Sequence, residues 1–276
     1  MSDESVATAP AVLVDQPSPG VRVITLNRPA RLNSMTMALV QGLHAALSDA
    51  ALDRRCRVVI LTGAGRGFCS GADLNGEGEQ PGAEAHDTVQ AGMVIQEAYA
   101  GLIPRMRAMP QVVIAAVNGP AIGGGLAIAL GADIRIAAES AKFAVAMIRI
   151  GLTGSDMGIS YLLPRYAGAS RAHELMLTGR MFDVHEAERI GMLSAVVPDG
   201  QALPAALDKA AQVMDNSPLG VRLTKQAMWA SLECGSIQAA IELENRNQIL
   251  AIRTEDSVEA VQAYFVEKRP PRWRER

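Results

Sequence analysis

The sequence is poor in cysteine, in aromatic side chains and in excess positive charge. Its 276 residues include three cysteines, which lie far apart and form no CxxC pair, so neither a disulfide framework nor a cysteine zinc site is expected. Aromatic side chains make up 4%, and 26 basic against 29 acidic residues give a net charge of −3. Nucleic acid is therefore not an expected partner, because a phosphate backbone selects a basic and often aromatic face.

Signals for secretion and for membrane insertion are also lacking. The first twenty residues carry three acidic residues and no Lys or Arg, which is the wrong charge for a signal peptide and predicts a cytoplasmic location. Residues 111–132 carry no charge, but Asn118, Pro120 and three consecutive glycines would leave backbone groups unpaired in lipid. We expect no membrane span, and predict a buried strand, a turn and a buried helix in this stretch.

Short apolar runs alternate with amphipathic segments over the first part of the chain. These runs predict strands: a hairpin from 11–14 and 21–26, then 57–63, 111–117, 133–138 and 143–145 in one sheet. An amphipathic segment at 40–47 predicts a helix that begins behind Asn33 or Ser34.

Helix signals dominate the last third of the chain. Capping residues predict helix starts at Asp183, Ser217 and Thr254. Strands that alternate with helices, followed by a helical tail, predict an α/β fold. We place a core domain at 1–200 and a C-terminal helical region at 201–276.

Two glycine-rich turns, 63–74 and 118–126, each follow a predicted strand directly. Neither is a generic phosphate loop, because a dinucleotide fingerprint meets Phe68 and a P-loop meets Gly125 where it needs lysine. Such turns bring backbone N–H groups close to a substrate and form an oxyanion hole, or they are merely tight turns. The acidic, glycine-rich segment 75–85 predicts a mobile loop beside the site.

These residues carry a resemblance to a known family. GRGFCSGADL (65–74) and AAVNGPAIGGGLAIALGADIRIA (115–137) resemble the enoyl-CoA hydratase/isomerase (crotonase) family, and NRPARLNSM (27–35), ELMLTGR (174–180) and FVEKRPPRW (265–273) fit it as well. The resemblance implies a crotonase-like spiral of ββα units with a C-terminal helical oligomerisation region, which forms a homotrimer or a dimer of trimers. It also implies an acyl-CoA thioester as substrate, with no metal and no separate cofactor.

Site residues follow from the resemblance position by position. It implies that the N–H groups of Ala72 and Gly124 hold the thioester oxygen and that Met147 and Ile148 line the acyl pocket. The residues implied in coenzyme A binding are Ala30, Leu32, Asp73 and Leu74 from one subunit, and Phe265 and Lys268 from its neighbour. In this scheme the backbone stabilises an enolate, and side chains only move protons or supply a nucleophile.

The acids depart from the family pattern. The two glutamates that hydratases of the family use are replaced by Ala127 and Met147, neither of which transfers a proton. Asp156 matches the aspartate of dienoyl-CoA isomerases, where it moves protons, and of 4-chlorobenzoyl-CoA dehalogenases, where it is the nucleophile. The dehalogenases also need an upstream histidine, where this chain has Ala100 and Gly101. A simple helix N-cap is the alternative for Asp156.

Three hypotheses for the function therefore stay open. The chain is nominally an enoyl-CoA hydratase or isomerase that stabilises a thioester enolate. Alternatively, it is an isomerase or a dehalogenase-like enzyme that depends on Asp156. The third hypothesis is a non-catalytic acyl-CoA-binding homologue that has lost the acids.

Overall fold

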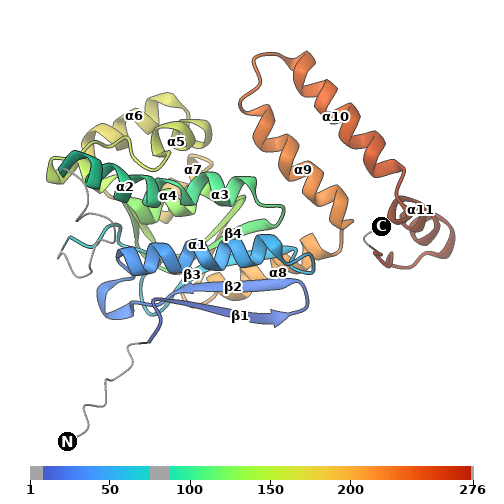
Figure 1. The fold of residues 1–276 in the computed structure, drawn as a ribbon, viewed down its shortest axis with the longest axis horizontal. Coiled ribbons are helices and arrows are strands. Elements are labelled where there is room, and N and C mark those ends of the chain that lie inside the picture. The colour runs from blue at the N-terminus through green and yellow to red at the C-terminus, as the bar shows by residue number, and fades with distance from the viewer. Residues whose placement is uncertain (1–8, 75–87, 275–276) are drawn as a thin grey trace, which may run out of the picture.

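The computed structural model describes residues 9–74 and 88–274, and these form two sheets with helices around them (Figure 1). A six-stranded sheet has the order β1-β2-β3-β4-β6-β9, and a three-stranded sheet has the order β5-β7-β8. The strands are β1 (Val12–Ser18), β2 (Val21–Leu26), β3 (Val58–Gly63), β4 (Val112–Val117), β5 (Ala121–Ile122), β6 (Ile134–Ala138), β7 (Lys142–Ala144), β8 (Phe182–Asp183) and β9 (Ala195–Val197).

Helices connect and cover these strands. They are α1 (Met37–Leu52), α2 (Thr88–Ala100), α3 (Leu102–Ala108), α4 (Gly124–Gly131), α5 (Ile159–Ala167), α6 (Ala169–Thr178), α7 (Val184–Arg189), α8 (Ala202–Met214), α9 (Pro218–Ser231), α10 (Ile237–Ile252) and α11 (Glu255–Val261). Short 3-10 turns η1 (Pro29–Arg31) and η3 (Ala146–Ile150) and a π-helical turn η4 (Gln262–Glu267) complete the set.

The large sheet bears out most of the predicted strands. β1 and β2 form the antiparallel hairpin, and β2, β3, β4, β6 and β9 run parallel. Every residue of β4 is buried, as its continuous apolar sequence predicted. The expectation that 143–145 continues this sheet is wrong. β7 pairs with β5 and β8 instead, where Phe143 stacks on Phe182 with ring centroids 5.5 Å apart.

Helices lie on both faces of the large sheet. α8 packs on one face through Ala202, Ala206 and Ala210, which follow each other at helical spacing and meet side chains such as Ile60 and Ile114. The larger core lies on the other face, under α1, α3 and α4. The boundary at 200/201 stays a prediction, and α8, just after it, belongs by its packing to the sheet.

Most predicted helix starts are confirmed. Asp183, Ser217 and Thr254 each accept a backbone N–H at the start of α7, α9 and α11. The expected cap of α1 is wrong, because Thr36 caps it. Asn33 has a left-handed backbone and a buried side chain, which donates to the carbonyl oxygens of the first glycine-rich turn instead.

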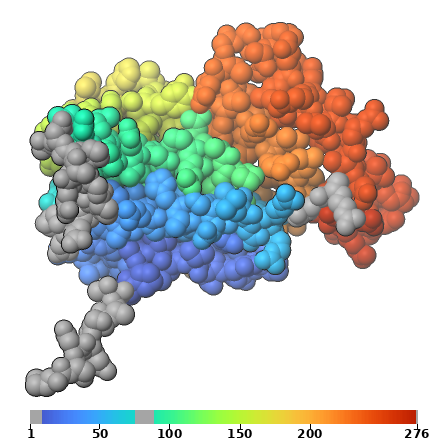
Figure 2. Space-filling model, in the orientation of Figure 1, coloured from blue at the N-terminus to red at the C-terminus, as the bar shows by residue number. Residues whose placement is uncertain are grey.

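The C-terminal helices extend outward from the α/β body. α9 contacts the body through the buried side chains of Lys225 and Trp229, α10 packs against α9, and α11 lies at the far end (Figures 1 and 2). Exposed apolar residues gather here: Ile237, Ile241, Ile249, Leu250, Ile252, Val258, Val261, Tyr264, Phe265 and Val266. In the described part of the chain, no helix combines the length and apolarity needed to cross a membrane. The predicted loop at 75–85 lies outside the described residues.

Candidate functional site

The two glycine-rich turns meet at the carboxyl ends of β3 and β4. Gly71 has a φ of +93°, and a β-carbon there would lie 3.0 Å from the Ile122 carbonyl oxygen and 3.5 Å from the Gly124 nitrogen. Only glycine adopts this conformation without strain and leaves this room. Cross-turn pairing between Cys69 and Ala121 fixes the contact. The N–H group of Ala72, the residue after Gly71, therefore lies near the N–H group of Gly124, the first residue of α4.

Among the described residues, neither of these N–H groups has a protein acceptor. The neighbours of Ala72 pair with the segment before α1: Met35 donates to Gly71 O at 2.8 Å, and Asp73 donates to Met35 O at 3.0 Å. Gly124 is the first residue of α4, where an N–H has no partner inside the helix. Within residues 9–74 and 88–274, neither Ala72 nor Gly124 donates a backbone hydrogen bond. Two donors near a helix N-terminus favour an oxygen that carries negative charge.

Methionines surround this pair of turns. A β-carbon on Gly124 would lie 2.1 Å from Met35 Cε and 3.1 Å from Met157 Sδ, and one on Gly123 would lie 3.6 Å from Met147 Sδ. All three methionines are buried. The wall is thus apolar and adaptable in shape. At the two positions where the family has glutamates, Met147 belongs to this wall and Ala127 is buried in α4.

Asp156 is not the N-cap of a helix. α5 begins at Ile159, and its cap residue is Gly158, which makes no side-chain capping bond. Asp156 instead opens a tight turn closed by a 2.8 Å bond from Ile159 N–H to its carbonyl oxygen, with Met157 and Gly158 both at positive φ. A positive φ at methionine costs about 1 kcal/mol and marks a constrained segment. This turn holds Met157 against Gly124 and leaves the Asp156 carboxylate free of capping.

Helix α2 connects Asp156 with the first glycine-rich turn. Gln96 Nε2 donates to Asp156 Oδ1, and one helical turn later Tyr99 Oη donates to Met35 O at 2.8 Å. Burial, with Asp73 as a second cause, raises the pKa of Tyr99, so its hydroxyl stays a donor. No pattern in the sequence indicated Gln96, which lies 60 residues from Asp156 on the exposed side of a helix.

The predicted coenzyme A residues fall into two groups. Ala30 and Leu74 are exposed beside the first turn, and Leu32 is half-buried there with its carbonyl oxygen bound by Ser70 N–H. The Asp73 carboxylate lies nearly buried and pairs with Arg28 at 2.7 Å, so its side chain holds the loop. In contrast, Phe265 and Lys268 are exposed and follow directly after α11. Helix α11 lies at the C-terminal end of the molecule, away from α2 and α4 (Figure 1).

Cys69 lies in the first turn but is unsuited to be a nucleophile. Its side chain is fully buried, and burial raises the pKa of the thiol to about 12. A thiol in this state does not supply the reactive thiolate. Within the described ranges, no group of three or more His, Cys, Asp or Glu side chains could hold a metal ion.

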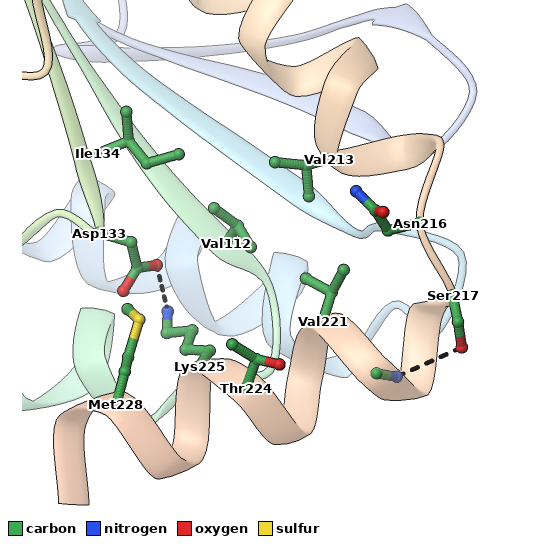
Figure 3. Close-up of a pocket in the computed structure, with 11 residues that line it drawn as sticks. Val112, Asp133, Ile134, Val213, Asn216, Ser217, Val221, Thr224, Lys225 and Met228 are labelled. Carbon is green, nitrogen blue, oxygen red and sulfur yellow. Dashed lines mark hydrogen bonds and ion pairs between the residues drawn. The ribbon is translucent and has the colours of Figure 1, made fainter. Parts of the chain in front are cut away.

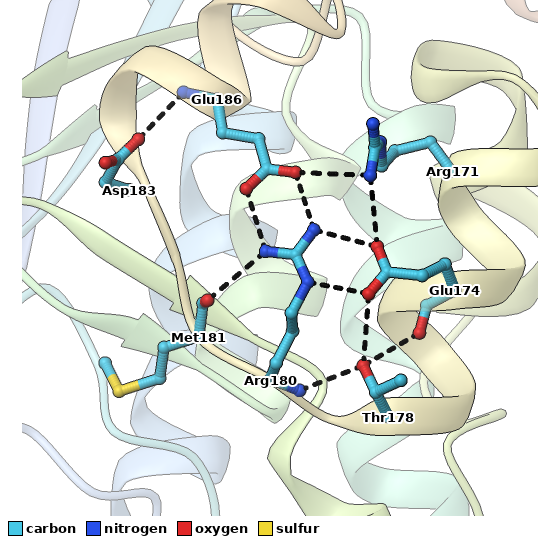
Figure 4. A network of polar contacts seen from close by, with 7 residues as sticks. All are labelled: Arg171, Glu174, Thr178, Arg180, Met181, Asp183 and Glu186. Carbon is cyan, nitrogen blue, oxygen red and sulfur yellow. Dashed lines mark hydrogen bonds and ion pairs between the residues drawn. The ribbon is translucent and has the colours of Figure 1, made fainter.

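An ion-pair network lies beside η3, the turn that carries Met147 and Ile148. Arg180 lies between Glu174 and Glu186, with 2.6 Å contacts to each, and Arg171 approaches the same two carboxylates (Figure 4). The hydrogen bonds from Arg180 lower the pKa of Glu174 to about 2. The network encloses the turn at Gly179, where a β-carbon would lie 2.5 Å from Ile148 Cγ2. The ion-pair network thus fixes the turn at Gly179, against which Ile148 of η3 packs.

A cavity of about 530 Å³ lies at the opposite, amino ends of β4 and β6, beside α9 (Figure 3). Its charged groups are fully occupied. Lys225 Nζ binds Met106 O, Gln111 O and Asp133 Oδ2, and Asp133 also accepts from Val113 N–H and Trp229 Nε1. Burial lowers the pKa of Lys225, which Asp133 partly opposes. The two charged side chains that line this cavity, Lys225 and Asp133, are therefore already paired within the protein.

Comparison with known proteins identifies the family of this chain. The family model for enoyl-CoA hydratase/isomerase matches residues 16–276. A probable enoyl-CoA hydratase of Mycobacterium bovis is 45% identical, over 96% of this chain and 93% of the relative. A 1,2-epoxyphenylacetyl-CoA isomerase of Escherichia coli is 40% identical, over 91% and 94%.

A solved structure is similar throughout. The crystal structure of a probable enoyl-CoA hydratase/isomerase from Mycobacterium abscessus superposes with a TM-score of 0.91 at 39% identity, and covers 97% of this chain and 99% of that one. The chain belongs to the enoyl-CoA hydratase/isomerase family. The predicted crotonase-like α/β fold with its C-terminal helices is confirmed. As a member of this family, the chain is an acyl-CoA enzyme.

Proposed function

We propose that this enzyme is an acyl-CoA isomerase that shifts a double bond by proton transfer at Asp156, with the N–H groups of Ala72 and Gly124 as its oxyanion hole. The observation that carries the proposal is the state of Asp156. The Asp156 carboxylate caps no helix and accepts a hydrogen bond from Gln96 Nε2, and the next residue in the same turn, Met157, packs on Gly124. A carboxylate that caps no helix and lies near the two oxyanion-hole donors suits enolate chemistry.

The proposed reaction balances with a single acid. The Asp156 carboxylate removes a proton from the α-carbon of a 3-enoyl-CoA, and the electron pair moves into the thioester oxygen. The N–H groups of Ala72 and Gly124 stabilise that oxyanion, and each contributes about 3 kcal/mol if it resembles other oxyanion-hole donors. The protonated Asp156 then returns the proton to the γ-carbon, and the product is the conjugated 2-enoyl-CoA.

Hydration is disfavoured by the side chains around the turns. Adding water to a double bond needs groups that activate water and deliver its proton. Ala127 and Met147 offer neither, and the methionine wall is apolar. The E. coli relative is named as an isomerase, which is compatible with isomerisation as the activity class, whereas the M. bovis relative named as a probable hydratase makes hydration the competing activity to measure.

Coenzyme A and subunit contacts complete the proposal. The exposed residues Ala30 and Leu74, with Leu32 and the backbone at Asp73, line the path of coenzyme A beside the first turn. Phe265 and Lys268 reach coenzyme A bound by a neighbouring subunit, in a homotrimer or a dimer of trimers. Supporting this is their position on an arm rich in exposed apolar residues, which favours contact with another chain.

The test measures isomerisation and hydration side by side. We expect the wild type to convert a short 3-enoyl-CoA to the 2-enoyl-CoA, followed by the ultraviolet absorbance of the conjugated thioester. Asp156→Asn should lower kcat by about 10²- to 10⁴-fold, because asparagine cannot exchange a proton. Binding of the 3-enoyl-CoA, measured by calorimetry, should persist.

Ser155→Ala, at the exposed neighbouring position, is the matched control and should keep wild-type turnover. Net hydration of 2-enoyl-CoA as the main reaction would overturn the proposal, as would full turnover by Asp156→Asn. Binding of every thioester without turnover would instead identify a non-catalytic acyl-CoA-binding protein.

A further inference from the structure

Asp156 faces a side chain that has both a hydrogen-bond donor and an acceptor. Gln96 Nε2 donates to Asp156 Oδ1. The second carboxylate oxygen, Oδ2, is then the one available to a substrate. A carboxylate that collects and returns a proton exists in two states: ionised it only accepts hydrogen bonds, and protonated it also donates. When Oδ2 carries the proton, Oδ1 remains an acceptor, so the Gln96 NH₂ can donate to Asp156 in both states.

The helix that presents Gln96 is held firmly in place. Tyr99 fixes α2 to Met35 O at 2.8 Å, and His44 contacts Ala98 O at 2.7 Å. The opposite side of the helix, including Ile95, packs on the main core. Gln96 is therefore anchored through its backbone, and its side-chain amide is hydrogen-bonded to Asp156. A donor on a rigid support is suited to orienting an acid.

We propose that Gln96 is a positioning residue for the proton transfer at Asp156: its amide NH₂ donates to Oδ1 both when Asp156 is ionised and when Oδ2 carries the proton. This inference rests on the proposed function of Asp156. Gln96 itself exchanges no proton, because an amide is neither acidic nor basic at neutral pH. Its contribution is to keep Asp156 pointed at the substrate in both halves of the reaction.

The test uses the 3-enoyl-CoA assay with two substitutions at one position. Gln96→Met has a similar length but no hydrogen bond, and should lower kcat about tenfold, the loss of one hydrogen bond to a charged group. KM should stay within about twofold, because no substrate contact is lost. Gln96→Lys keeps a donor to the carboxylate but places a cation beside it, which favours the ionised form and makes it a weaker base, so we expect it to lose kcat as well.

Matched controls separate positioning from simple tethering. Glu97→Met places the same side chain at the next exposed position and should keep wild-type kcat. In an Asp156→Asn background, Gln96→Met should cause no further loss, since Gln96 acts through the acid. Thermal melting of each variant checks that it is folded.

Several outcomes would overturn the inference. Wild-type kcat in Gln96→Met would exclude any role, and wild-type kcat in Gln96→Lys alone would leave only a tether between α2 and the loop. An equal loss in both backgrounds would show that Gln96 acts independently of Asp156. If Asp156→Asn kept full turnover, the proposed function would fall and this inference with it. If Asp156→Asn were inactive but Gln96→Met normal, only this inference would fail.

Discussion

The two ends of the large sheet differ in how their polar groups are satisfied. At the amino ends, the cavity of about 530 Å³ surrounds a lysine and an aspartate that bind each other and four further protein groups. At the carboxyl ends, two backbone N–H groups find no acceptor among the described residues, and the Asp156 carboxylate has one neutral side-chain partner there. Groups left available for a substrate, rather than the size of a cavity, distinguish the reactive end of this fold.

The first test of this contrast removes the buried cation at the amino ends of the strands. Lys225→Met should leave the Asp133 carboxylate buried without its cation, and should lower the free energy of unfolding by about 3–5 kcal/mol. Because this site lies at the other end of the sheet, kcat of the folded enzyme should stay unchanged. Denaturant unfolding and steady-state kinetics measure the two effects.

Thr224→Val, an exposed neighbour that lines the same cavity, is the control and should change stability by less than about 0.5 kcal/mol. A large fall in kcat for Lys225→Met, with the enzyme still folded, would contradict the separation of the two ends.

The second test removes one donor at the carboxyl end. Gly124→Pro deletes the N–H at the first position of α4, where proline is otherwise well accommodated. We expect kcat to fall by about 10²- to 10³-fold, the effect of losing one oxyanion-hole donor. Thermal stability should change much less than in Lys225→Met, which would sharpen the contrast between the two ends.

Gly124→Ala controls for crowding, because its β-carbon meets the flexible end of Met35 in the same way while the N–H remains. We expect the alanine variant to be clearly faster than the proline variant. Equal kcat values for the alanine and proline variants would show that crowding of Met35, and not loss of the N–H donor, lowers the rate.

The third test, with the smallest expected effect, concerns the ion-pair network in which Arg180 binds Glu174 and Glu186. Arg180→Met should lower stability by about 1 kcal/mol at neutral pH, since Arg180 and Glu174 are each 36% exposed and solvent screens their attraction. The pKa of Glu174 is lowered from 4.5 to about 2 by Arg180, so its contribution is complete above about pH 4.5 and disappears as the pH falls toward about 2.

Melting curves of wild type and Arg180→Met, recorded above and below this range, should therefore converge at the acidic end. Arg171→Met is the comparison variant, because Arg171 makes longer contacts of 3.3 and 3.7 Å with the same carboxylates and should matter less. A constant difference at all pH values would show that Arg180 acts through packing and not through its charge.

Local patterns in the sequence were enough for the core and for the turns. The apolar β-branched runs became β3 and β4, and Ser217 and Thr254 became helix caps, because burial and capping depend on residues close together in the chain. The glycine content likewise pointed to close backbone contacts, and Gly71 makes one. Two expectations failed. Thr36 caps α1, because the Asn33 side chain binds the first glycine-rich turn instead, and β7 joined the second sheet, where it pairs with β5 and β8.

By itself, the sequence determined the α/β class, the two glycine-rich turns and the absence of the family's glutamates. The tertiary structure alone decided what surrounds Asp156. A lone aspartate before a helix is compatible with a cap, and only the left-handed turn at Met157 moved the helix start to Ile159. The pairing with Gln96, 60 residues away, depends on how α2 packs across the core, and no short-range pattern encodes that.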